Sequence, residues 1–237
     1  MPASATIHSF SSDAAGQPPD GVLVAFPPGS WNMVRPTLLC RSLVLAGLIL
    51  AIMGFRFLPY ALSSTDPLLP WLWGMTPLWA VMLFGVATFR PLWLGWAVPL
   101  AAMVLSDVVL HVTGLAPVTL AGRLVLYSIM LAIGGLGLVV RYWRRAPVVA
   151  GASVASSLLF FLVTNFLVWL RAPAEASSAI VYEPNLAGLI FCYEMALPFL
   201  RNDLLGTGLF SFVLFGGFAL LEKGLPVLRV PTAAEAA

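Results

Sequence analysis

The stretch PLAAMVLSDVVLH, from Pro99 to His111, is an apolar run interrupted at Asp107 and again at His111. An ionised carboxylate inside a bilayer is costly unless it faces a partner or water. The stretch is therefore predicted to lie in a transmembrane helix, and Asp107 is the residue whose surroundings most need an explanation.

The composition predicts an all-α, polytopic membrane protein. The chain has 237 residues, of which 60% are hydrophobic and 9% charged, whereas soluble domains average about 25% charged residues. Its formal charge of +2 and its scattered Lys and Arg residues argue against a nucleic-acid partner. The two cysteines, Cys40 and Cys192, have no metal-ligand spacing, so neither a disulfide nor a metal site is expected.

Six membrane spans are expected, because a spanning helix needs about 20 apolar residues and turn-forming residues separate the apolar segments. The predicted spans are 38–58, 71–89, 92–112, 120–142, 148–170 and 204–221. The apolar segment 185–200 ends near Pro198 and is too short for a confident crossing, so it is predicted to be a re-entrant or interfacial half-helix. Residues 1–34 are expected to form a disordered tail and residues 224–237 a short second tail.

An even number of spans places both termini on one side of the membrane. With that side cytoplasmic, eight basic residues lie inside and four outside, as the positive-inside rule requires. The inside residues are Arg35, Arg41, Arg90, Arg141, Arg144, Arg145, Lys223 and Arg229, and the outside residues are Arg56, Arg123, Arg171 and Arg201. Both termini are therefore predicted to be cytoplasmic, in a bacterial inner membrane.

Most of the costly polar residues gather at the outer ends of these spans. This distribution predicts a pocket that opens to the outside above a tightly packed inner half. The candidate ligand-binding residues are Asp107, His111, Arg123, Asn165, Trp169, Glu194 and Asn202.

Each candidate also has a structural interpretation. Asp107 can pair with Arg123 or Arg56 to neutralise both charges, and Asn165 can hydrogen-bond to a neighbouring helix. Trp169 suits an interfacial anchor, and Glu194 suits a surface helix. Asn202 can cap a helix that begins beside it.

Catalysis has little support in the sequence. Neither GxSxG nor HExxH is present, and an aspartyl dyad would require Asp107 and Asp203 to approach within hydrogen-bond reach. The chain is therefore predicted not to be an enzyme, and no cofactor is expected.

Several strings resemble an uncharacterised family of bacterial six-span membrane proteins, a domain of unknown function. They are LAIMGFRFLP, PLWAVMLFG, PLAAMVLSD, SSLLFFLVTNFLVW and NLAGLIFCYEMALPFLRNDLLG, between about residues 45 and 215. The chain departs from the pattern at Thr207, where an acid is expected, and near Val86, where a small residue is expected.

That family is in turn similar to the substrate-binding S components of energy-coupling-factor transporters. The similarity implies six helices, a ligand held near the outer face, and docking to a transmembrane coupling protein with two ATPases. It implies that small residues on the first helix supply the docking surface, here Ser42, Ala46, Gly47 and Ala51. Gly151 and Ala155, four residues apart, have the spacing of close helix packing in lipid.

The leading hypothesis is therefore a small-molecule-binding subunit of a transporter. The alternative is an accessory or scaffold membrane protein whose polar residues only join helices. A hydrated outer cavity lined by those residues would favour binding, whereas their complete mutual pairing would favour the scaffold.

Overall fold

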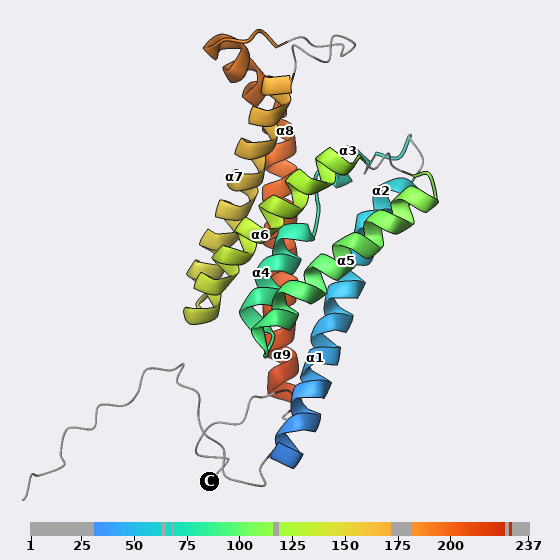
Figure 1. Cartoon of the computed structure of the whole chain (residues 1–237), viewed down its shortest axis with the longest axis vertical. Helices are drawn as coiled ribbons and strands as arrows, with labels where there is room; N and C mark the ends of the chain where they lie inside the picture. Colours follow the sequence, from blue (N-terminus) through green and yellow to red (C-terminus); the bar gives the residue numbers. More distant parts are fainter. Residues whose placement is uncertain are drawn as a thin grey trace, which may run out of the picture.

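The computed structural model describes residues 31–62, 65–67, 69–115, 119–171, 182–225 and 228. The described residues form helices and connecting turns without a strand, which confirms the all-α prediction (Figure 1). The helices are α1 (Trp31–Gly54), η1 (Phe55–Phe57), α2 (Leu58–Ala61), α3 (Leu69–Leu72), α4 (Leu78–Thr88), α5 (Leu92–Val112), α6 (Leu120–Tyr142), α7 (Ala146–Arg171), α8 (Leu186–Ser211), the π-helical turn η3 (Phe212–Gly216) and α9 (Gly217–Gly224).

The short helix α4 forms the centre of the bundle. All 11 of its residues are buried, and α1, α5, α6, α7 and α8 pack around it. Its sequence, LWAVMLFGVAT, is apolar on every side, as expected of a helix surrounded by other helices. The largest buried side chains of the core include Trp79 and Phe84 of this helix.

The structure corrects the second predicted span, 71–89. Helix α4 begins only at Leu78, after a turn in which Gly74 has a φ of +89° and Pro77 occupies the N-cap position. Eleven residues extend about 16 Å, which is well short of a hydrocarbon core of about 30 Å. Nonhelical backbone precedes α4, a conformation that membrane proteins tolerate only where it is shielded by protein or water.

Five other helical segments are long and apolar enough to cross a membrane, which indicates an integral membrane protein. They are Leu38–Ala61, Leu92–Val112, Leu120–Tyr142, Ala146–Arg171 and Leu186–Gly224. The second and third of these have the bounds predicted from the sequence, and the first and fourth overlap the spans predicted at 38–58 and 148–170.

The predicted half-helix at 185–200 is wrong, because it continues without a break into the last predicted span. Helices α8, η3 and α9 form one helical segment of 39 residues, with Pro198 inside α8. Pro198 and Glu194, one turn before it, are exposed on α8, and transmembrane helices often accommodate a proline. At about 1.5 Å per residue, the segment is much longer than the hydrocarbon core is thick.

The start of α1 and the end of α9 lie at the same end of the bundle (Figure 1). The predicted tails fall largely outside the described residues, although residues 31–34, assigned to the first tail, belong to α1. We call this end of the bundle, where α4 also ends, the basic end.

Helices α4 and α5 approach closely at a pair of glycines. A Cβ atom on Gly85 would lie 2.5 Å from Cγ of Pro99 and 2.7 Å from the carbonyl oxygen of Gly95. By contrast, Gly47 of α1 is exposed and a Cβ atom there would meet nothing within 4 Å. The close contact of α4 with α5 therefore depends on the missing side chain at Gly85.

We expect Gly85→Ala and Gly47→Ala to change stability in opposite directions. Overpacking at Gly85 should lower the free energy of unfolding by about 1–3 kcal/mol, whereas alanine in the open helix position of Gly47 should raise it by about 0.5–1 kcal/mol. Thermal unfolding of the detergent-solubilised chain measures both. Equal effects at the two positions would contradict the packing described.

Candidate functional site

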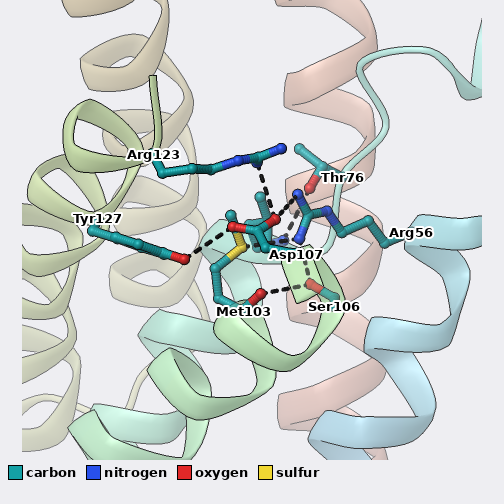
Figure 2. A network of polar contacts seen from close by, with 8 residues as sticks. Arg56, Thr76, Met103, Ser106, Asp107, Arg123 and Tyr127 are labelled. Carbon is teal, nitrogen blue, oxygen red and sulfur yellow. Dashed lines mark hydrogen bonds and ion pairs between the residues drawn. The ribbon is translucent and has the colours of Figure 1, made fainter. Parts of the chain in front are cut away.

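A cluster of charged side chains surrounds Asp107 near the end of α5 (Figure 2). Its Oδ1 atom lies 2.7 Å from Nη2 of Arg56 and 3.0 Å from Nη1 of Arg123. The hydroxyl of Tyr127 donates to Oδ2 over 2.9 Å. Asp107 is only 5% exposed, so η1, α5 and α6 each contribute to a nearly enclosed ionic network.

The network holds two arginines and one carboxylate, and Arg56 makes further contacts with α5. Arg56 also donates to the hydroxyl of Ser106 and lies 3.2 Å from the sulfur of Met103. The hydroxyl of Ser106 in turn donates to the carbonyl oxygen of Met103 over 2.8 Å. These contacts hold Arg56 against α5, and the mutual pairing is the arrangement expected of a structural ion cluster.

Only two of the predicted ligand-binding residues, Asp107 and Arg123, meet in this cluster. His111 lies one turn beyond Asp107 and is exposed. Asn165 donates to the carbonyl oxygen of Phe161 in its own helix over 2.8 Å.

Trp169 is half-buried near the end of α7, and Glu194 is exposed on α8. The indole N–H of Trp169 donates to the carbonyl oxygen of Glu183 over 2.9 Å, which ties the end of α7 to the segment before α8. Neither side chain reaches Asp107 through a contact found among the described residues.

Asn202 is buried in the middle of α8, where it binds the backbone of α3 and of the turn between α3 and α4. Its side-chain amide donates to the carbonyl oxygens of Pro70 and Trp73, each over 3.0 Å. Gly206 lies one turn further along α8, and a Cβ atom there would be 2.9 Å from Cα of Met75. Asn202 therefore satisfies backbone acceptors and is not the helix cap that the sequence suggested.

The neighbouring Asp203 is also buried and joins a second polar network. Its Oδ1 atom accepts a hydrogen bond of 2.9 Å from the indole of Trp79 in α4. Ser157 donates to Thr207 over 3.1 Å, and Ser153 donates to Ser211 over 2.8 Å, so hydroxyl pairs also join α7 to α8. Asp107 and Asp203 belong to separate networks, and no contact among the described residues joins them as a dyad.

The small residues proposed for helix packing or docking have mixed positions. Gly47, Ala51 and Gly151 are exposed, whereas Ser42, Ala46 and Ala155 are half-buried. The face of α7 that packs inside the chain instead carries Ala152, Ser153, Ser156 and Ser157.

Arginine side chains bind the backbone at the end of α4. Arg141 donates to the carbonyl oxygens of Val86 and Phe89 over 2.9 and 2.8 Å. Arg144 donates to that of Ala87 over 2.9 Å.

Arg41 reaches the same helix end from α1. It donates to the carbonyl oxygen of Thr88 over 3.4 Å and forms an ion pair with Glu222. Its guanidinium also lies 4.8 Å from the ring centre of Phe218. Cations at a helix C-terminus complement both its unpaired carbonyl groups and its dipole.

These arginines line a cavity of about 500 Å³, which we call the basic pocket. Its lining residues are Arg41, Ala87, Thr88, Arg90, Arg141, Arg144, Ala219, Glu222 and Lys223. Among the described lining residues, five cationic side chains thus share the cavity with one carboxylate, and that carboxylate is paired with Arg41. The cavity size is within the usual range for small-molecule sites.

In the sequence these arginines indicated only the membrane topology, and the pocket was not predicted. The clustering of Arg141, Arg144 and Arg145 between two apolar helices was visible in the sequence. Their convergence with Arg41 and Lys223, from distant parts of the chain, depends on the packing of α1, α6 and α9 around α4.

Comparison with known proteins gives one match. A family model described as a family of unknown function (DUF6580) matches residues 37–228. This agrees with the resemblance to an uncharacterised family, and it brings no support for similarity to S components. No curated protein and no solved structure matches the chain.

We expect Asp107→Asn to destabilise the fold strongly. Loss of the carboxylate leaves Arg56 and Arg123 without their shared counter-charge, and breaking a buried ion pair typically costs about 3–5 kcal/mol. Adding Arg123→Gln to this variant should restore part of the loss, because one uncompensated charge is removed. The thermal unfolding midpoint in detergent measures the effect, with the exposed Glu194→Gln as control. An Asp107→Asn midpoint equal to that of the control would refute the structural role.

Proposed function

The chain belongs to the DUF6580 family of unknown function, and we propose that it is a membrane protein that binds a small anion in the basic pocket at the end of α4. The observation that carries this proposal is a cavity of about 500 Å³ whose described lining holds five cationic side chains and one carboxylate. A cavity lined mainly by charges of one sign raises the local concentration of ions of the opposite sign.

The pocket has donors to offer a ligand. Each of two arginines contacts α4 through a single nitrogen, which is Nη1 in Arg141 and Nη2 in Arg144. A guanidinium carries five N–H donors, so the described contacts with α4 do not use all the N–H groups of either arginine. Guanidinium groups bind phosphate and carboxylate with paired, charge-assisted hydrogen bonds, which makes such anions the best-matched ligands.

The basic pocket lies at the opposite end of the bundle from the outer face, where the sequence predicted the ligand. Asp107, Arg56, Arg123 and Tyr127 pair with one another. In the orientation that the arginine distribution predicts, the basic pocket faces the cytoplasm.

We propose that the chain acts as a subunit of a transporter, as the sequence resemblance implies. A coupling protein and ATPases would then supply the energy, because the chain has no phosphate-binding loop of its own. Co-purification of such subunits with the chain tests this role. We continue to expect that the chain is not an enzyme.

A scaffold protein without a ligand is the second candidate. The direct pairing of Asp107 with Arg56 and Arg123 favours it, since mutual pairing of polar residues is the arrangement expected of a structural cluster. The two candidates differ in their expected response to a soluble anion.

Calorimetric titration of the purified full-length chain with pyrophosphate tests the proposal. The double variant Arg90→Gln/Lys223→Gln changes two exposed residues of the pocket and spares the arginines that bind α4. We expect binding to weaken about tenfold or more, because a hydrogen bond to a charged group contributes about 1.5–3 kcal/mol.

The control is Arg171→Gln, an exposed arginine at the far end of α7, which should bind as the wild type does. If the wild type does not bind pyrophosphate, or if the double variant binds equally well, the anion-binding proposal is refuted in favour of the scaffold.

A further inference from the structure

A second cavity adjoins the basic pocket and has a different character. It measures about 770 Å³ and lies between the first turns of α7 and the segment formed by α8, η3 and α9. Figure 1 shows α7 diverging from α8 towards the basic end. We call this cavity the apolar groove. Its wall includes Val149, Val154, Leu204, Phe212 and Phe215.

The groove and the basic pocket share part of their walls. Thr88, Arg144, Ala219 and Glu222 line both cavities. Glu222 is paired with Arg41, so its charge is compensated at the junction. An apolar space therefore opens directly onto a strongly cationic one.

Part of the groove wall is also exposed on the outside of the bundle. Val154 is 48% exposed and Phe212 is 76% exposed, although both belong to helical segments that can span a membrane. The π-helical turn η3 lies in the wall of the groove, and such turns are frequent at functional sites.

We propose that these joined cavities bind an anionic phospholipid of the surrounding bilayer, with its phosphate in the basic pocket and an acyl chain in the apolar groove. The inference rests on the proposed function and specifies the class of its ligand. Charge complementarity selects the occupant, because a neutral lipid would leave the excess cationic charge uncompensated and a soluble anion would leave the groove unused. Basic pockets between transmembrane helices are a recognised mode of binding acidic headgroups.

Gly208 offers a way to fill the groove without altering the charge. It lines the groove, and a Cβ atom there would meet nothing within 4 Å. Gly208→Leu should therefore fold normally and occupy space that the acyl chain needs. Gly135→Leu is the matched control, because Gly135 of α6 is equally open and does not line either cavity.

Native mass spectrometry of the full-length chain, released from bilayers of equal phosphatidylglycerol and phosphatidylcholine, provides the test. We expect the wild type and Gly135→Leu to retain one phosphatidylglycerol in preference to phosphatidylcholine. Gly208→Leu should lower this retention about fivefold or more, because each buried methylene adds to lipid affinity. Arg90→Gln/Lys223→Gln should abolish the preference for the anionic lipid.

The soluble probe separates this inference from the proposed function. Gly208→Leu should bind pyrophosphate as the wild type does, because the basic pocket is unchanged. If pyrophosphate binds but phosphatidylglycerol is not preferred, or if Gly208→Leu and Gly135→Leu retain it equally, the lipid inference is wrong and the anion pocket stands. If neither probe binds, both proposals fail.

Discussion

The hydrogen bonds between arginine side chains and the last carbonyl groups of α4 are the interaction on which the rest of the structure depends. A helix that ends inside a protein leaves carbonyl oxygens without partners, and unpaired polar groups are especially costly in a membrane. Arg41, Arg141 and Arg144 supply the missing donors at Val86, Ala87, Thr88 and Phe89. This capping allows a helix of 11 buried residues to occupy the centre of the bundle.

The other end of α4 has a related solution. Helix α3 and the turn that follows it present backbone acceptors at Pro70 and Trp73, and Asn202 of α8 donates to both of them. The indole of Trp79, in the first turn of α4, donates to Asp203, the residue after Asn202 in α8. Asn202 and Asp203, which resemble a helix start in the sequence, thus lie in the middle of the continuous helix α8. From there they hold the beginning of α4 and the segment before it in place.

The Asp107 cluster and the basic pocket differ in how their charges are paired and in how much open volume lies beside those charges. Around Asp107, cations and their partner lie in direct contact, and the network binds η1, α5 and α6 together. At the end of α4, the capping arginines leave a cavity that further cations line. Excess positive charge beside open volume is the reason to seek a ligand there, and the adjoining apolar groove is the reason to seek an amphiphilic one.

The sequence by itself determined the all-α membrane class and the bounds of α5 and α6, because long apolar runs between turn residues depend only on local composition. It also identified Asp107 and its pairing with Arg56 or Arg123, since a carboxylate in an apolar helix requires a counter-charge. Only the tertiary structure decided that 71–89 holds a short helix, because the segment around Gly74 and Met75 packs against Asn202 and Gly206 of α8. It also showed that 186–221 is one continuous helical segment. The basic pocket was likewise decided by packing, which gathers arginines far apart in the chain around one helix end.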